Sequence, residues 1–249
     1  MSPNLCIIGS SHVGAVKQAE AQIMAVFSDV SLDWFALPGG AFRRGTVTNG
    51  VYSANPQNDA EAAVIAKVNG GLSRDLKPYG ALWVIGHRFG LGAVLQAWLS
   101  EPSTKARTAM RDLVGDSVAR IKARFGTDTR LTVSPAPYPA LRVRQDGPHH
   151  EARIAAILTR DDADAICADY ESAIQNALAD AGCTFQPQPA HTRARAFTTD
   201  NIYLRDARDF RAPDDRTTDL RHMNAAYGAA LFTDFATRHL GLTPAATPT

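Results

Sequence analysis

Two stretches near opposite ends of the chain carry side chains that together can perform nucleophilic catalysis. Ser11 follows a short apolar run that starts at Leu5, and Asp219 and His222 lie three residues apart just before an amphipathic segment. A serine hydroxyl becomes a nucleophile when a histidine takes its proton and a carboxylate holds that histidine in the correct tautomer. Ser11, His222 and Asp219 supply these three chemical groups.

Each stretch also has a purely structural explanation. A serine after a strand often caps the next helix, because its hydroxyl accepts a hydrogen bond from a free backbone N–H. An aspartate near a helix start is stabilised by the positive end of the helix dipole. Asp214 and Asp215 are further carboxylates that could orient His222, although the three-residue spacing favours Asp219. The occurrence of both stretches in one chain favours the catalytic interpretation.

The segments that must position these side chains alternate between short apolar runs and longer stretches with helical spacing. Strands are predicted at residues 5–8, 31–37, 81–85, 130–133 and 184–186. Helices are predicted at residues 12–27, 59–68, 91–125 with a break near Pro102, 161–181 and 224–240. This order predicts an α/β fold, a three-layer α/β/α sandwich around a mostly parallel, flavodoxin-like central sheet of about five strands.

The connections have the composition of turns and loops. After the second strand, Pro38 to Asn58 reads as a long loop with a hairpin at Asn49-Gly50, and Asn58 or Asp59 is expected to cap the following helix. Residues 139–151 are expected to form another loop. No internal repeat or linker divides the chain, which predicts one domain over residues 1–249 with a disordered tail at 243–249.

Composition narrows the class of protein. The chain has 249 residues, with 26 Lys plus Arg against 25 Asp plus Glu, so its net charge of +1 favours neither a nucleic acid nor a membrane surface as partner. Its three cysteines, Cys6, Cys167 and Cys183, are far apart and are expected to be buried free thiols. The N-terminus lacks signal-peptide features, and no apolar stretch is long enough to span a bilayer, so a cytoplasmic protein is expected.

Two blocks of residues make the sequence similar to the SGNH (GDSL-like) hydrolase family. Gly9-Ser10-Ser11 resembles the first family block, with Ser10 in place of its usual Asp, and Asp219-Leu220-Arg221-His222 before a helix resembles the last. The resemblance implies that Ser11 is the nucleophile, His222 the general base and Asp219 the residue that orients it.

The two middle blocks of this family supply oxyanion donors, and here the match is incomplete. Gly39 or Gly40 stands where the family's second block provides a backbone N–H. Gly86-His87-Arg88 replaces the family's Gly-x-Asn, so Arg88 takes the position of a donor asparagine. Its guanidinium could donate to an oxyanion or hold an anionic substrate group, or it could simply pair with a carboxylate at the sheet edge. His87 is expected to be a packing residue.

Two polar segments could recognise a substrate. The first contains Arg43 and Arg44, and the second contains Arg142 and Arg144. They could form a rim that binds sugars or acidic groups, and solvated surface is the alternative explanation for these residues.

The resemblance implies ester hydrolysis through an acyl-enzyme, on a small acyl ester such as an O-acetylated carbohydrate, with no metal and no cofactor. Two alternatives remain. The replacement of the oxyanion asparagine fits a binding module for a glycan or acidic ligand that has lost turnover. The same triad also fits an O-acyltransferase that passes the acyl group to a sugar hydroxyl. The oligomeric state is left open.

Overall fold

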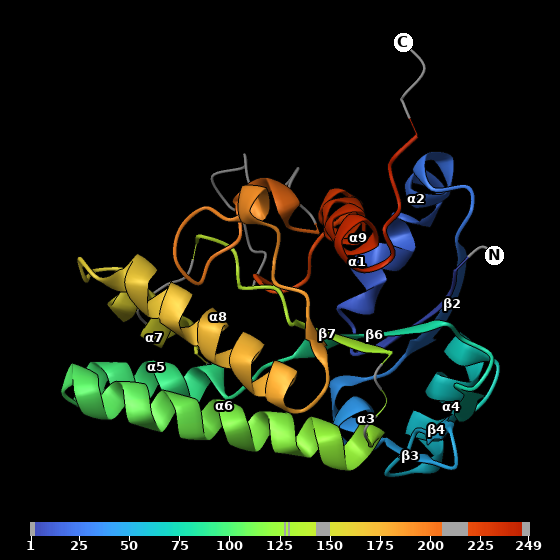
Figure 1. Ribbon diagram of the computed structural model, residues 1–249, viewed down its shortest axis with the longest axis horizontal. Helices are drawn as coiled ribbons and strands as arrows, with labels where there is room; N and C mark the ends of the chain where they lie inside the picture. Colours follow the sequence, from blue (N-terminus) through green and yellow to red (C-terminus); the bar gives the residue numbers. More distant parts are fainter. Residues whose placement is uncertain (1–2, 127, 129, 143–149, 206–218, 246–249) are drawn as a thin grey trace.

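The computed structural model describes residues 3–126, 128, 130–142, 150–205 and 219–245. Figure 1 shows a central sheet with helices on both faces, which is the predicted three-layer α/β/α arrangement. Its strands are β1 (Asn4–Gly9), β2 (Ser31–Ala36), β6 (Ala81–His87), β7 (Leu131–Pro135) and β8 (Thr184–Phe185). They lie in the order β2-β1-β6-β7-β8 and every neighbouring pair is parallel. The predicted five-stranded parallel sheet is therefore confirmed.

Alternate residues of β1 divide the core into two clusters. Leu5 and Ile7 pack in one cluster, while Cys6 and Ile8 pack in the other, because successive side chains of a strand point to opposite faces. The first face is covered by α1 (Val13–Gln18), α2 (Glu20–Val26) and α9 (Ala225–His239). The second is covered by α5 (Leu91–Ser100), α6 (Ser103–Phe125), α7 (Glu151–Ile157) and α8 (Ala163–Asp180).

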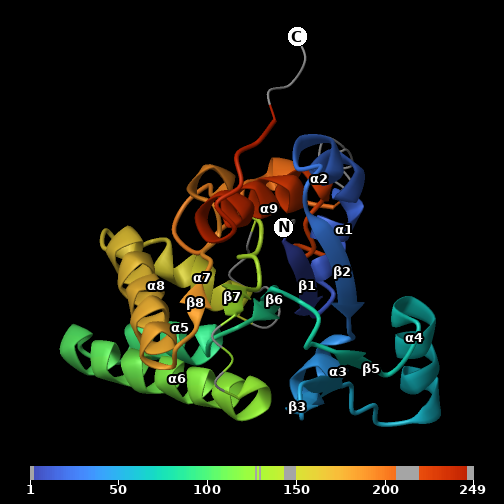
Figure 2. The same cartoon turned by 45° about the vertical axis from the view of Figure 1, so that its right-hand side comes forward.

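The polar segment after β2 contains more regular structure than the sequence predicts. The hairpin at Asn49-Gly50 is confirmed as β3 (Thr46–Thr48) and β4 (Val51–Ser53), and β5 (Ser73–Asp75) adds a third antiparallel strand. The Asn58 side chain caps α4 (Asp59–Asn69) by accepting a hydrogen bond from the Glu61 N–H. Figure 2 shows β3, β5, α3 and α4 grouped beside the ends of β1 and β2.

Two features of the prediction are wrong, and one helix is additional to it. The single helix expected at 12–27 is two helices, which meet at the buried Ala19; this residue keeps a right-handed helical backbone, with φ of −86° and ψ of 0°, but belongs to neither helix. Gly39 and Gly40 do not lie in a loop, since α3 (Gly39–Arg44) begins there. The structure also places α7 directly after the second expected loop, most of which, at 143–149, lies outside the described residues. Two 3-10 turns, Ala190–Thr192 and Asn201–Tyr203, lead toward the last helix.

A close contact between α1 and α9 brings the two ends of the chain together. Gly228 makes this possible, because a Cβ at this position would lie 2.0 Å from the Ala15 carbonyl oxygen. On the sheet side of α9, the ring of Phe235 stacks on Trp83 with a centroid distance of 4.0 Å. The helix is therefore fixed between α1 and the sheet, and the segment that precedes it ends near the start of α1.

The remaining expectations concern the cysteines, the tail and membrane spans. Cys6, Cys167 and Cys183 are buried and unpaired, as predicted. Near the C-terminus, the Ala245 N–H donates to the Val26 carbonyl, and residues 246–249 of the expected tail lie outside the described part. Among the described helices, none combines the length and the apolar character needed to cross a bilayer.

Candidate active site

The candidate site lies where the carboxyl ends of β1, β2 and β6 meet. Two glycines allow this close approach. A Cβ on Gly9 would lie 2.3 Å from the Ile85 carbonyl oxygen, and a Cβ on Gly86 would lie 2.1 Å from Ser10 Oγ. Gly86 also has a φ of +102°, which L side chains rarely adopt. The turns after β1 and β6 can therefore lie against each other only with glycine at these positions.

Ser11, His222 and Asp219 form a continuous chain of hydrogen bonds. The distance from Ser11 Oγ to His222 Nε2 is 2.8 Å, and the distance from His222 Nδ1 to Asp219 Oδ2 is 2.5 Å. The other oxygen of Asp219 accepts from the backbone N–H groups of Arg221 at 3.2 Å and His222 at 3.3 Å. With its proton on Nδ1, the His222 ring donates to Asp219 and leaves Nε2 free to accept the Ser11 hydroxyl proton.

The structural explanations for these two stretches do not fit the geometry. The N-cap of α1 is His12, no side chain bonds to its first turn, and the Ser11 hydroxyl instead faces His222. At the other end, Asn224 caps α9 by accepting a hydrogen bond from the Tyr227 N–H. Asp219 lies five residues before the cap and is not part of it. Asp214 and Asp215, the other carboxylates considered for His222, lie outside the described residues.

Asp219 is held in its ionised form. Partial burial raises the pKa of its carboxyl group, but the hydrogen bonds from His222 and from the backbone N–H of Arg221 outweigh this effect. The net pKa of Asp219 is lowered from its ordinary value. A negative charge therefore remains next to the His222 ring at neutral pH.

His12 is a part of the site to which the sequence assigned no role. Its ring stacks on His222 with a centroid distance of 5.3 Å and an interplanar angle of 29°. Burial lowers the pKa of His12 to about 3, and repulsion from His222, Arg88 and Arg221 adds to the shift. His12 is therefore neutral next to the ring that must become positively charged.

Gly39 and Gly40 are distinguished by their surroundings. Gly39 lines the cavity beside Ser11, whereas a Cβ on Gly40 would face the side chains of Arg44 and Glu61. The backbone N–H groups of Gly39 and Ser11 make no hydrogen bond within the described part of the chain. Of the two glycines, Gly39 is thus the one that lines the cavity beside Ser11 with a backbone N–H that is uncommitted within the described residues.

The turn after β6 holds Arg88 in a constrained backbone. The next residue, Phe89, has a φ of 42° although it is bulky and buried, and Gly90 follows with a φ of 70°. The Tyr170 hydroxyl, from α8, donates to the Arg88 carbonyl oxygen at 3.0 Å. Strain of this kind persists when neighbouring contacts stabilise it, and it is common at functional sites. His87 packs edge-on against Phe89, as expected for a packing residue, and burial lowers its pKa to about 4.

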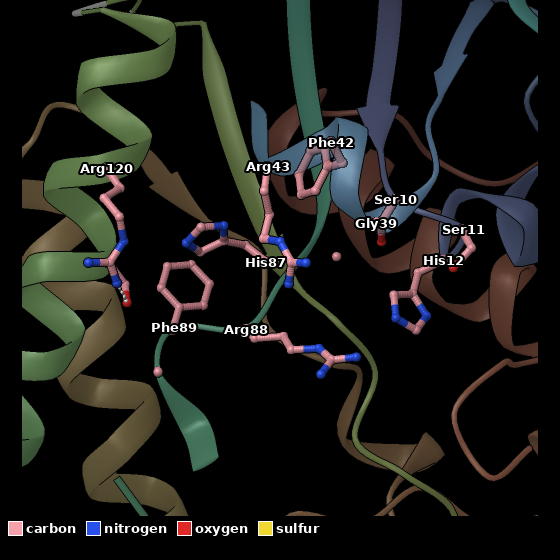
Figure 3. Close-up of a pocket in the computed structure, with 13 residues that line it drawn as sticks. Ser10, Ser11, His12, Gly39, Phe42, Arg43, His87, Arg88, Phe89 and Arg120 are labelled. Atoms are coloured by element: carbon pink, nitrogen blue, oxygen red, sulfur yellow. Dashed lines mark hydrogen bonds between the residues drawn. The ribbon is translucent and has the colours of Figure 1, made fainter. Parts of the chain in front are cut away.

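Arg88 does not make the carboxylate pair that offered a structural explanation for it. Within the described residues, it forms no ion pair, and its guanidinium points toward the space beside His12 (Figure 3). Burial lowers the pKa of Arg88, and repulsion from Arg221 and Arg43 lowers it further. These arginines therefore lie near the same space.

The predicted polar rim is only partly described by the structure. Arg43 belongs to this rim, Arg142 is exposed, and Arg144 lies outside the described residues.

Ser11 lies between two hollows. One is a cavity of about 240 Å³ that is also lined by Gly39, Arg43 and Arg88. The other, of about 40 Å³, is lined by Ser11 together with His222, Arg205 and Met223. A substrate whose reacting bond lies at Ser11 would therefore extend from that bond into both hollows.

Comparisons with known proteins do not supply a family. No family model matches the chain, and no curated protein is similar to it. Among solved structures, the chain is similar to the extracellular lipase of Streptomyces rimosus, with 12% identity, a TM-score of 0.39 and coverage of 92% of this chain and 96% of the lipase.

Proposed function

We propose that the chain is a serine ester hydrolase of the SGNH type that acts on a small acyl ester through an acyl-enzyme. The observation that carries the proposal is the hydrogen-bonded chain from Ser11 through His222 to Asp219, with distances of 2.8 and 2.5 Å. Ser11 lies more than 200 positions before Asp219 and His222 in the sequence, so their alignment depends on the whole fold.

The first step forms the acyl-enzyme. Ser11 Oγ attacks the ester carbonyl carbon while His222 Nε2 takes the serine proton. The carbonyl oxygen becomes an oxyanion, and the N–H groups of Ser11 and Gly39 would donate to it, with the Arg88 guanidinium supplying positive charge. His222 then passes its proton to the alcohol oxygen, the bond between the carbonyl carbon and that oxygen breaks, and the alcohol leaves.

The second step releases the acid. Water occupies the place of the alcohol and gives a proton to His222 as its oxygen attacks the acyl carbon. The bond between that carbon and Ser11 Oγ breaks, and His222 returns the proton to Ser11. Asp219 keeps the ring oriented and compensates its positive charge in both steps, while the neutral His12 adds no opposing charge.

The residues that line the two hollows support a placement for the two parts of the substrate. His222 must protonate the alcohol oxygen, so the alcohol belongs in the hollow that His222 lines. Gly39 and Arg88, which would face the oxyanion, line the larger cavity, so the acyl group belongs there. A carbohydrate hydroxyl, as suggested by the sequence, would then occupy the open side next to Arg205 and Met223.

Covalent labelling tests this proposal directly. A fluorophosphonate probe should label the purified protein at Ser11, located by mass spectrometry of the peptides, and the protein should hydrolyse short-chain p-nitrophenyl esters. Ser11→Ala should lose the labelling and reduce kcat by roughly 10³-fold or more. Ser10→Ala is a matched control, because Ser10 Oγ is buried without a hydrogen-bond partner in the described residues, and it should still be labelled at Ser11. Turnover in Ser11→Ala equal to that of the wild type would exclude the mechanism.

The same experiment separates the two alternative functions. A binding module without turnover would bind a glycan or acidic ligand but leave Ser11 unlabelled, and the short distance from Ser11 to His222 argues against it. An O-acyltransferase would be labelled, but adding a sugar acceptor would convert the product from free acid to acylated sugar. Product analysis with and without the acceptor decides between hydrolysis and transfer.

A further inference from the structure

The cavity beside Ser11 is lined by three arginines and by no acidic side chain of the described residues. Arg43 comes from the end of α3, Arg88 from the turn after β6, and Arg120 from α6. The neighbouring hollow between β6 and α8 adds Arg221 and, again within the described residues, no acidic lining. The net charge of the whole chain is only +1, so this cluster of arginines is a local concentration of positive charge.

Other arginines of the fold are paired with carboxylates. Arg193 forms an ion pair with Glu171 at 2.6 Å, and Arg74 forms one with Asp33 at 2.9 Å. In contrast, Arg43 and Arg88 make no ion pair within the described part of the chain. Figure 3 shows both guanidinium groups pointing into the cavity, while Arg120 lies to the left, beyond His87 and Phe89, where it donates to Ser117 Oγ at 2.9 Å.

The repulsion among these arginines is a cost that an anion would remove. The pKa of Arg88 is lowered first by burial and then by Arg221 and Arg43, which shows that the positive charges interact. His12 and His87 are neutral, with pKa values lowered to about 3 and about 4, so they neither add to this charge nor compensate it. A bound carboxylate would accept hydrogen bonds from guanidinium groups that otherwise repel each other.

The location of this charge specifies which part of the substrate is anionic. Arg43 lies in the same six-residue helix as Gly39, and both line the cavity assigned to the acyl group. The cavity volume of about 240 Å³ lies just below the usual range for ligand pockets, which begins at about 300 Å³, so the acyl group must be short. A single oxyanion does not need three arginines in addition to two backbone N–H groups.

Building on the ester hydrolase function above, we propose that the substrate is a half-ester of a short dicarboxylic acid. Its free carboxylate binds to Arg43, while the Arg88 guanidinium, which enters the same cavity, faces the reacting carbonyl. Hydrolysis consumes one water and releases the alcohol, the dicarboxylate and one proton. Arg43 is thus a specificity-determining residue.

Matched esters test the charge preference. Monoethyl glutarate and ethyl pentanoate have acyl chains of the same length and the same leaving alcohol, and ethanol release measures both reactions. The anionic ester should have a kcat/KM higher by roughly tenfold or more, the effect of about one charge-assisted hydrogen bond. Higher ionic strength should reduce the preference. A second pair, 4-acetoxybenzoate and its methyl ester, carries the charge on the alcohol side and should show no such preference.

Two variants connect the preference with Arg43. Arg43→Met should lower the ratio of kcat/KM for monoethyl glutarate to that for ethyl pentanoate by about tenfold. Arg111→Met, on the exposed surface of α6, removes the same charge away from the cavity and should leave the ratio unchanged. Equal losses for both esters in Arg43→Met would show that Arg43 has no role in recognising the anion, and would overturn the proposal.

The outcomes separate this inference from the proposed function. Hydrolysis of ethyl pentanoate as fast as monoethyl glutarate, with Ser11 labelled, would refute the anionic acyl group and keep the esterase. A preference only in the acetoxybenzoate pair would also refute it, because the anion would then belong to the alcohol. No hydrolysis and no labelling would refute both. Calorimetric titration of Ser11→Ala with monoethyl glutarate then shows whether the cavity binds an anion at all.

Discussion

The rings of His12 and His222 are stacked at a centroid distance of 5.3 Å, and only His222 bonds to Ser11 and Asp219. His12 Nδ1 is buried and has no hydrogen-bond partner within the described residues. Stacking one histidine on another would be unfavourable if both were charged. The strongly lowered pKa of His12 keeps its ring neutral and avoids this conflict.

This arrangement predicts that His12 makes folding stability depend on pH. In the unfolded chain the His12 ring titrates near its ordinary pKa of 6.5, whereas in the folded chain it titrates near 3. Between these values the unfolded state binds a proton that the folded state does not bind, so the free energy of unfolding falls as the pH falls. The contribution of His12 to this slope is at most about 1.4 kcal/mol per pH unit.

His12→Phe keeps a ring that can stack on His222 and removes the titrating nitrogens. Urea unfolding at a series of pH values from 7 to 4 should therefore give a shallower slope for the variant than for the wild type. Identical slopes would show that His12 does not titrate abnormally.

Replacing Asp219 by Asn should reduce catalysis with little effect on folding. The amide oxygen can still accept from the backbone N–H groups of Arg221 and His222, but it no longer carries a negative charge beside the ring. In a buried triad this change costs about 10⁴-fold in kcat, and the partial exposure of the Asp219 side chain predicts roughly 10²- to 10⁴-fold. Because the lowered pKa of Asp219 keeps its carboxylate ionised, the ratio of wild-type to variant kcat should not vary across neutral pH. Steady-state kinetics at several pH values will measure this ratio. A loss of less than about tenfold would mean that another group orients His222.

The contact between α1 and α9 predicts a clear steric effect. A Cβ at position 228 would lie 2.0 Å from the Ala15 carbonyl oxygen and 2.3 Å from its carbon, so one helix would have to move. Overpacking of this kind costs about 1–3 kcal/mol, and the higher helix propensity of alanine recovers up to about 1 kcal/mol. Gly228→Ala should thus lower the free energy of unfolding and also reduce kcat, because α9 positions His222 relative to Ser11.

Gly115→Ala is the matched control for this substitution. Gly115 lies in the middle of α6, where an added Cβ would meet no atom within 4 Å. Here only the higher helix propensity of alanine acts, so chemical denaturation should show a free energy of unfolding that is higher by roughly 0.5–1 kcal/mol. Equal effects of the two substitutions would contradict the role of Gly228 in helix packing.

The sequence predicts the parts of the fold that rest on local patterns. The five apolar runs became the five parallel strands, and Pro102 marks the break between α5 and α6, because these features act within a few residues. Helix α3 was not predicted, since Gly39 and Gly40 after a proline have the composition of a turn. Its stability depends on distant partners. Arg44 at its end forms an ion pair with Glu61 and donates to the Asn55 carbonyl at 2.8 Å.

The same distinction applies to the candidate site. Ser11, Asp219 and His222 could be named because their spacing and context resemble two known blocks. Arg88 and Arg43 were each expected near the substrate, but their meeting with Arg221 could not be predicted, because the three residues belong to separate segments. His12 was overlooked for a related reason. Its position next to the nucleophile was visible, but its burial and its contact with His222 exist only in the folded chain.

The backbone N–H of Gly39 can be removed without a change of side-chain charge, which tests its role as an oxyanion donor. Gly39 is the first residue of α3, a position where proline is well tolerated because the N–H has no helical partner. Pro38 has a ψ of 145°, the extended conformation that a following proline requires. Gly39→Pro should therefore fold, and it should reduce kcat by roughly 10²- to 10³-fold with a smaller effect on KM. In Gly39→Ala the N–H is kept and the new Cβ meets no atom within 4 Å, so this variant should stay close to the wild type. If both variants lost the same activity, the effect would come from the shape of α3 and not from the donated hydrogen bond.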